Sequence, residues 1–254
     1  MSDTPLLPAG VGMSRLRVYP WQTRDHLHGG SPHMHLTCTE CYAVLGGRGE
    51  LHTLTADGLS RVPLAAGDAV WFTPGTIHRA VNVEDLNVQV IMENDGLPEA
   101  GDAVMTFPPE HLADPEAYAA AASLGDGLPA ERQDRARARR DLAVQGFERL
   151  VADVEHGSGE LLQEFYRTAA ALVAGRLDTW EASWRAKALA AAEATGEQIA
   201  ALRRGDVSHL GRARVARIGA PEQDTLGMCG FLAVYPRERA LDGRGEGGAS
   251  PRSA

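Results

Sequence analysis

The chain has 254 residues, of which 44% are hydrophobic and 23% are charged, a composition typical of a soluble globular protein. Its formal net charge of −9 argues against nucleic acid and anionic membrane surfaces as partners, because both require clustered positive charge. No segment has the run of about 20 apolar residues that spans a bilayer, and none has the form of a signal peptide, so we expect a cytoplasmic protein.

Short β-strands are predicted in the first part of the chain. After a loose leader over 1–14, glycine, proline or Asp-Gly turns separate short runs rich in β-branched residues. The predicted strands cover Leu16–Tyr19, 33–45, 48–55, 60–64, 69–73, 78–83 and 86–92. Strands spaced in this way are typical of an antiparallel barrel or sandwich, and we predict one such domain over residues 1–95.

The pattern changes after residue 95. An irregular connection is expected over 96–129, and helical spacing of apolar residues then predicts a helical region over 130–212. Within it, Thr195-Gly196-Glu197-Gln198 has the form of a capping box and predicts that a new helix begins there. The predicted fold class is therefore mainly β in the N-terminal half and α in the C-terminal half.

Two further predictions concern the end of the chain. Residues 213–236 are expected to contain one more strand, at Met228 to Tyr235, that returns to the barrel. Residues 237–254 are rich in glycine, arginine and serine and have no apolar anchor, so a disordered tail is expected there.

The candidate site comes from three histidines and one glutamate in the β region. His33 and His35 are separated by one residue, so in a strand they lie on the same face, about 7 Å apart along it. Glu40 follows closely, and His78 lies beyond a glycine-rich stretch. If neighbouring strands bring Glu40 and His78 to the same wall, the four side chains can bind one divalent cation.

These residues and the glycines around them resemble the cupin superfamily over about residues 30–95. The first cupin motif, His-x-His followed by Glu and then Gly, is matched by His33, His35, Glu40 and Gly46 or Gly47. The second motif, with a glycine at each end of a proline turn and then His and Asn, is matched by Gly67, Gly75, His78 and Asn82. Thr73 stands where the family usually has a first proline, beside Pro74.

The resemblance implies a cupin-type antiparallel β-barrel, or jelly roll, with the helices as an appendage. It also implies a homodimer, because cupins commonly dimerise. The motifs do not recur, so a single barrel is expected. Cupins carry out several chemistries, so the fold does not define the reaction.

The ligand set of three imidazoles and one carboxylate suits a divalent transition metal. Fe(II) is favoured, and Mn, Ni, Zn, Cu and Co are the alternatives. Four protein ligands leave two positions of an octahedron for substrate and dioxygen, as in non-haem iron oxygenases. Because histidine binds metal when neutral, we expect metal loss as the pH falls through about 6.

Three functions remain open at this point. The favoured one is a non-haem Fe(II) oxygenase that acts on a small polar metabolite. The alternatives are a Mn-, Zn- or Ni-dependent isomerase, epimerase or lyase, and a cupin that binds metal and ligand without catalysis.

Other polar residues are candidates for substrate contact. Tyr42 shares the strand face of Glu40, and Gln89 lies in an apolar strand where its amide needs a partner, so both are candidate catalytic residues. The arginines between 132 and 140 are interspersed with acidic residues and are interpreted as a solvated helix face, with an anionic-substrate clamp as the alternative.

Overall fold

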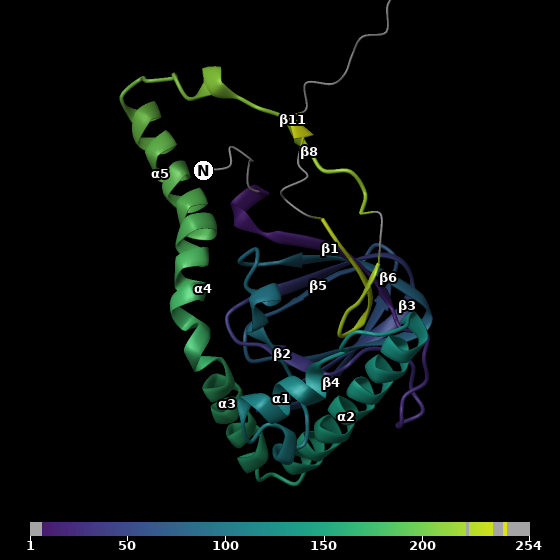
Figure 1. Cartoon of the computed structure of the whole chain (residues 1–254). Helices are drawn as coiled ribbons and strands as arrows, with labels where there is room; N and C mark the ends of the chain where they lie inside the picture. Colours follow the sequence, from purple (N-terminus) through teal and green to yellow (C-terminus); the bar gives the residue numbers. More distant parts are fainter. Residues whose placement is uncertain (1–6, 222–223, 236–240, 243–254) are drawn as a thin grey trace, which may run out of the picture.

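A curled antiparallel sheet of nine strands forms the N-terminal part of the computed structural model, which describes residues 7–221, 224–235 and 241–242. Figure 1 shows the strands closing around an interior, with the later helices along the left of the view and the earlier ones below the strands. The nine strands are β1 (Gly12–Val18), β2 (His33–His35), β3 (Glu40–Thr55), β4 (Gly58–Ala65), β5 (Ala69–Phe72), β6 (Ile77–Met92), β7 (Ala103–Met105), β9 (Thr225–Leu226) and β10 (Gly230–Val234).

The long strands β3 and β6 hold the barrel together. They pair with each other along most of their length, and each also pairs with shorter strands on its other edge. The sequence predicted a turn near Gly47, but β3 passes through this point with irregular register. Gly47 has φ +76°, and a Cβ there would lie 2.3 Å from the carbonyl oxygens of Glu84 and Asp85. Glycine therefore bends the strand here and lets it pass close to β6.

Both the connection and the C-terminal segment contribute strands. β7 lies in the segment predicted to be irregular and pairs with β2. β10 pairs with β1 and β9 pairs with β10, so the chain returns to the barrel after the helices. The tail predicted over 237–254 lies outside the described residues, except that β11 (Leu241–Asp242) pairs with β8 (Ala216–Arg217) in a separate small sheet.

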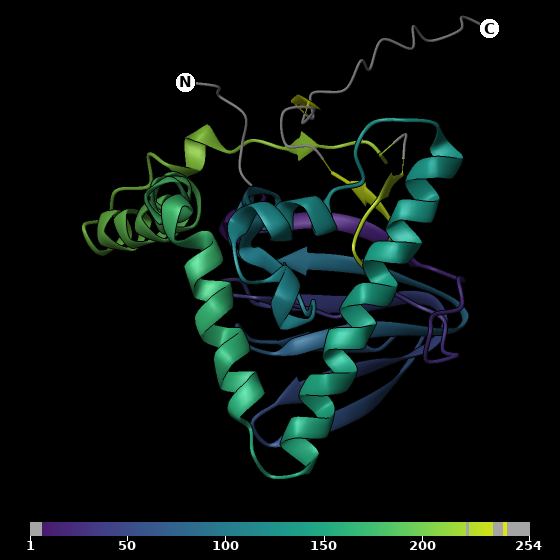
Figure 2. The ribbon, with the colours of Figure 1, turned by 60° about the horizontal axis from the view of Figure 1, so that its bottom comes forward.

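Five α-helices lie between β7 and β8 in the described part of the chain, and Figure 2 shows α2 and α3 diverging from a tight turn across the barrel. They are α1 (Pro115–Ala122), α2 (Pro129–Glu155), α3 (Glu160–Val173), α4 (Leu177–Trp184) and α5 (Ala190–Arg203). Short 3-10 or π turns occur at Pro8–Gly10, Pro98–Asp102, Pro109–His111, Ala174–Arg176, Arg185–Leu189 and Leu210–Arg212. None of the helices within the described ranges combines the length and the apolar character needed to cross a membrane.

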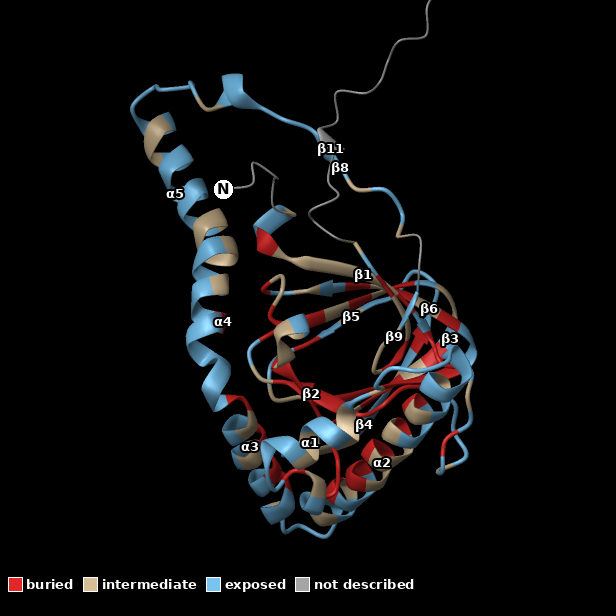
Figure 3. Ribbon diagram, viewed as in Figure 1, coloured by how far each residue is buried: buried red, intermediate tan, exposed pale blue. Residues whose placement is uncertain are grey.

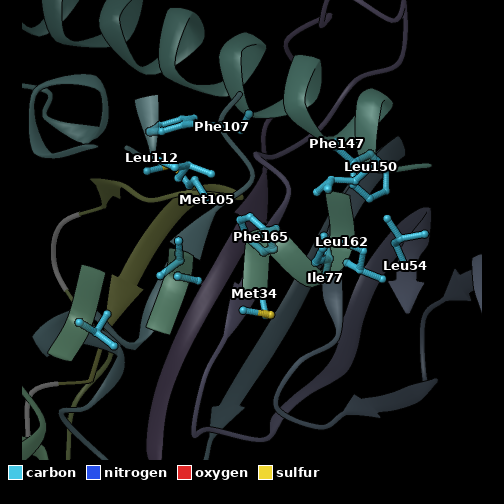
Figure 4. Packing of buried hydrophobic residues seen from close by; sticks show 14 of the residues in the cluster. Met34, Leu54, Ile77, Met105, Phe107, Leu112, Phe147, Leu150, Leu162 and Phe165 are labelled. Atoms are coloured by element: carbon cyan, nitrogen blue, oxygen red, sulfur yellow. The ribbon is translucent and has the colours of Figure 1, made fainter. Parts of the chain in front are cut away.

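A shared apolar core joins α2 and α3 to the barrel (Figure 4). Leu162 and Phe165 of α3 belong to the same buried cluster as Met34, Leu54 and Ile77 of the strands. The helices are therefore packed on the barrel, and burial of this cluster stabilises both parts together. The predicted fold class, a β N-terminal half and an α C-terminal half, is confirmed.

The last helices are mostly exposed, as the pale-blue surface of α4 and α5 in Figure 3 shows. The helix start predicted at Thr195 is wrong, because α5 runs through Gly196 without interruption. The Thr195 hydroxyl donates a hydrogen bond to the Ala191 carbonyl one turn earlier and does not cap a new helix.

Candidate metal centre

Four side chains from three strands converge inside the barrel. His33 and His35 lie on β2, His78 is the second residue of β6, and Glu40 is the first residue of β3. His33 and His78 are directly opposite each other in the β2–β6 pairing. One potential ligand atom from each of the four residues lies within 4.8 Å of the others, and all four residues are buried. The alternation of side chains along β2 thus brings both of its histidines to one wall, as the sequence predicted.

Each imidazole is oriented by an acceptor on its outer nitrogen. The acceptors are Ser31 O at 3.0 Å from His33 Nδ1, Asp102 Oδ2 at 2.9 Å from His35 Nδ1, and Thr76 O at 3.2 Å from His78 Nδ1. In the neutral rings Nδ1 then carries the proton, and Nε2 has a free lone pair. Metal-binding histidines in proteins are held in this way.

Two of the inner atoms lack hydrogen bonds in the described structure. Glu40 Oε2 lies 3.1 Å from His78 Nε2 and 3.2 Å from His35 Nε2. Within the described part of the chain, Glu40 Oε2 and His78 Nε2 are buried and make no hydrogen bond. Buried polar atoms without partners are costly, and a divalent cation between them would satisfy both. Three nitrogen donors and one carboxylate therefore fit a first-row divalent metal.

The charges of the cluster shift its pKa values in opposite directions. Burial lowers the pKa of His33 well below its ordinary value, and the neighbouring His78 and His35 act in the same direction. Burial also opposes protonation of His35, but Asp102 and Glu40 outweigh it and raise the pKa of His35 to about 9. Burial raises the pKa of Glu40, but the adjacent His35 and His78 outweigh it and hold that pKa well below the usual range. The two carboxylates beside His35 thus favour positive charge at this position, which supports binding of a cation there.

Asp102 was not predicted from the sequence. It is fully buried, and its second oxygen accepts hydrogen bonds from Thr37 N at 2.8 Å and Thr37 Oγ1 at 2.7 Å. It lies 67 residues from His35, in a segment expected to be irregular, so no spacing rule connects the two. The carboxylate is held rigidly by Thr37 and in turn orients His35.

A cavity of about 280 Å³ opens onto the cluster. His33, His35 and Glu40 line it, together with apolar side chains such as Val90 and Met92. Tyr42 also lines this cavity, as its position two residues from Glu40 predicted. Burial and the nearby Glu40 raise the pKa of Tyr42 well above its ordinary value, and its hydroxyl is buried without a hydrogen-bond partner in the described structure. Tyr42 is therefore a protonated phenol at neutral pH.

Gln89 lies on the face of β6 that points away from the cavity. Val88 and Val90 are buried, whereas the Gln89 amide donates to Ser14 O on the adjacent strand at 2.8 Å. Gln89 is not among the residues that line the cavity. The same period-two rule that selected Tyr42 assigns the inner face of this strand to Val88 and Val90. The Gln89 amide thus has the hydrogen-bond partner that its place in an apolar strand requires, the backbone carbonyl of Ser14 in β1.

Arg132 and Arg137 of α2 are exposed, as a solvated helix face requires, but Arg139 and Arg140 differ from that expectation. Arg140 is 1% exposed and donates to the carbonyls of Trp21 and Gln22 and to Asp141. Arg139 lines the cavity that holds the histidines. Arg140 donates to the loop that follows β1, and Arg139 donates to Gly227 O between β9 and β10. Local charge spacing does not reveal these contacts.

Comparison with known proteins identifies the class of this barrel. Residues 25–92 match the family model described as a cupin domain. The chain thus contains a cupin domain, and the predicted resemblance is confirmed. No curated protein matches the chain.

Several solved structures resemble the barrel weakly. Pac13 from Streptomyces, described as a nucleoside dehydratase, is 16% identical, with a TM-score of 0.27, and the match covers 35% of this chain and 62% of that one. An oxalate oxidase in complex with glycolate is 23% identical over 33% of this chain and 40% of its own, with a TM-score of 0.27. A predicted oxalate decarboxylase from Thermotoga maritima is 22% identical over 32% and 61%, with a TM-score of 0.25. At these values the likeness defines neither activity nor substrate.

Proposed function

We propose that this protein is a metal-dependent cupin enzyme that acts on a small polar metabolite, with Fe(II)-dependent oxygenation as the favoured chemistry. The observation that carries the proposal is the convergence of three imidazoles and one carboxylate within 4.8 Å at a cavity wall. The outer nitrogens of the imidazoles already have acceptors, so the inner nitrogens are free for a cation.

The proposed ligands are His33, His35, Glu40 and His78. When bound, Fe(II) would supply open coordination positions for a chelating substrate and for dioxygen. The chain's own contribution is to hold the ligands in place: Asp102 fixes the tautomer of His35, and backbone carbonyls fix the other two rings. Apolar side chains on the cavity wall exclude water from the reacting groups.

Oxygen consumption tests this proposal. Protein reconstituted anaerobically with Fe(II) is mixed with a broad panel of small hydroxy, keto and diketo acids, and oxygen uptake is followed with an electrode. We expect uptake with at least one substrate, and its loss in His78→Ala. The matched control is His52→Ala, which removes a buried barrel histidine that hydrogen-bonds Glu50 and lies outside the cluster. Zero uptake across the panel in iron-loaded protein contradicts the oxygenase.

Tyr42 favours a second candidate, an isomerase, epimerase or lyase that uses Mn, Zn or Ni. A buried, protonated phenol without a hydrogen-bond partner can donate a proton to a substrate in the same cavity. Turnover in the absence of oxygen that falls strongly in Tyr42→Phe selects this candidate. A co-purifying small molecule without turnover selects a cupin that binds its ligand without catalysis.

A homodimer remains a prediction, as does the cytoplasmic location. Phe165 of α3 and Trp180 of α4 are buried within the chain, whereas Trp184 at the end of α4 is 37% exposed. A dimer contact through α4 and α5 would therefore use Trp184 and the exposed Ile199 and Leu202. Light scattering of the purified protein gives the mass in solution, and a monomeric mass removes this prediction.

A further inference from the structure

Arg139 is a half-buried cation without an ion-pair partner among the described residues, and it lines the cavity that holds the histidines. It comes from α2, and its Nε is buried without a hydrogen-bond partner in the described structure. Its only hydrogen bonds within that structure run from Nη1 to Ala122 O at 3.2 Å and from Nη2 to Gly227 O at 2.7 Å. A guanidinium has five N–H donors, so three remain without a protein acceptor.

Two arginines that are fully buried each have a carboxylate partner. Arg79, which is 1% exposed, pairs with Asp25, and Arg140 pairs with Asp141. Arg139 makes no ion pair with any carboxylate of the described residues, and burial lowers its pKa. A partly buried charge with an unpartnered Nε, which only backbone carbonyls compensate, costs free energy, and an anion bound beside it would offset that cost.

The position of Arg139 connects it to the candidate metal centre. Gly227 O accepts its hydrogen bond and also one from the Tyr19 hydroxyl at 3.0 Å. Two residues further on, Cys229 Sγ lies 3.7 Å from His33 Nδ1. The short segment from Gly227 to Cys229 therefore links the guanidinium to the edge of the cluster, and Arg139, Cys229 and His33 line one cavity.

Apart from the histidine cluster and the cation it would hold, the cavity wall has a single cationic side chain among the described lining residues, that of Arg139. The carboxylates there are those of Glu40 in the cluster, of Asp95, which pairs with Lys187, and of the exposed Glu99. The rest of the wall is largely apolar, with Leu16, Leu226, Leu232 and Val234 among its members.

We propose that Arg139 binds the carboxylate of a small organic acid with an apolar body, held in the cavity beside the histidine cluster. This assignment rests on the proposed function, because it assumes that the substrate binds in this cavity. A guanidinium binds a carboxylate through paired, charge-assisted hydrogen bonds, which supply both affinity and orientation. The acid end lies at Arg139, and the remainder of the molecule extends along the apolar wall toward the histidines.

The test compares acids with their uncharged amides. Acetate, butanoate, 3-methylbutanoate and hexanoate, together with the four corresponding amides, are titrated into the full-length protein and followed by protein-observed NMR. Both metal-free and Zn(II)-loaded protein are used. We expect at least one acid to bind in both forms with a Kd at least about tenfold lower than its amide, the factor that loss of a charge-assisted hydrogen bond implies.

Variants on one helix separate recognition from folding. Arg139→Gln is expected to weaken binding of the acid about tenfold or more and to leave binding of the amide unchanged, whereas Arg139→Lys retains part of the preference for the acid. Arg135→Gln is the matched control, because Arg135 also donates to two backbone carbonyls, those of Leu124 and Asp126, but does not line the cavity. It should bind like the wild type.

The assignment is overturned if no acid binds the wild type below 10 mM, if amides bind as well as acids, or if Arg139→Gln retains wild-type affinity for the acid. The comparison of acid with amide in the wild type stands even if Arg139→Gln does not fold. Zn(II) content, measured on the same samples, is expected to be equal in wild type and Arg139→Gln. A failure of the metal proposal therefore appears as absent zinc, and a failure of this assignment appears as absent carboxylate preference.

Discussion

Replacing Asp102 with asparagine tests how the chain prepares His35 for metal. Asp102 is fully buried, and its Oδ2 accepts a hydrogen bond from His35 Nδ1 at 2.9 Å. Asparagine has the same shape, and its carbonyl oxygen can keep both hydrogen bonds from Thr37. Its NH₂ group then faces His35 Nδ1 and favours the ring tautomer with the proton on Nε2, the nitrogen that would bind the metal.

The expected loss follows from that change of tautomer. Removing an acceptor that orients a metal-bound histidine typically weakens metal binding about 10- to 100-fold, which corresponds to about 1.4–2.7 kcal/mol. We therefore expect Asp102→Asn to bind Zn(II) about 10- to 100-fold more weakly than the wild type at pH 7.5. Competition against a chromophoric chelator measures both affinities, and circular dichroism checks that the variant is folded.

Asp114→Asn provides the matched control for this experiment. Asp114 caps α1 by accepting from Glu116 N and Ala117 N, and asparagine caps helices equally well. Its Zn(II) affinity should equal that of the wild type. Wild-type Zn(II) affinity in folded Asp102→Asn would refute the view that this carboxylate orients His35 for metal binding. An equal loss of Zn(II) affinity in Asp114→Asn would show that the loss is not specific to the site.

Three further predictions concern stability. Leu162→Ala should lower the free energy of unfolding by about 2–5 kcal/mol, because Leu162 is 1% exposed in the core shared by helices and barrel. Gly146→Ala should destabilise the fold despite the better helix propensity of alanine, because a Cβ there would lie 1.9 Å from a backbone carbonyl oxygen. Asp25 has a pKa lowered from 3.8 to about 2. Burial raises this pKa, but hydrogen bonds from Arg79, Thr23 and the backbone N–H of Leu27 outweigh that effect. A folded-state pKa below the unfolded one stabilises the protein above about pH 4, so about 1–2 kcal/mol, discounted for partial exposure, should be lost as the pH falls toward 2.

Denaturant unfolding measures all three effects, with a control for each. Leu161→Ala removes a neighbouring leucine that is 43% exposed and should cost far less than Leu162→Ala. Gly196→Ala lies within α5 with open space around the new Cβ and should stabilise by about 0.5–1 kcal/mol. Asp25→Asn should remove the corresponding part of the acid sensitivity. Equal effects within either of the first two pairs, or an unchanged pH profile in Asp25→Asn, would contradict the reasoning.

The features that the sequence predicted correctly depend on residues close together in the chain. The alternation of side chains brings His33 and His35 to one wall, and the two motifs identify Glu40 and His78 as their companions. The same rule, applied to β6, would have assigned Gln89 to the outer face. The turn expected at Gly47 is a bend within a long strand, because a glycine at positive φ serves either structure.

The contributions that the sequence did not predict depend on contacts between distant segments. Asp102 reaches His35 across 67 residues, through a strand that pairs with β2. Arg139 lies in a helix whose charge pattern is typical of a solvated surface, but it is half-buried and donates to Gly227 O between the C-terminal strands β9 and β10. In both cases contacts between segments distant in the sequence, and not local composition, decide where the polar side chain lies.

The metal content of the purified protein tests the central claim most directly. Full-length protein prepared without chelators is dialysed against equimolar Fe(II), Mn(II) or Zn(II) without oxygen, and bound metal is determined by elemental analysis. We predict one metal ion per chain in the wild type and in His52→Ala, and less than about a tenth of that in His78→Ala, because loss of a ligand removes a large part of the binding free energy. Equal metal content in His78→Ala and His52→Ala, or no bound metal in the wild type, would contradict a single metal held by His33, His35, Glu40 and His78.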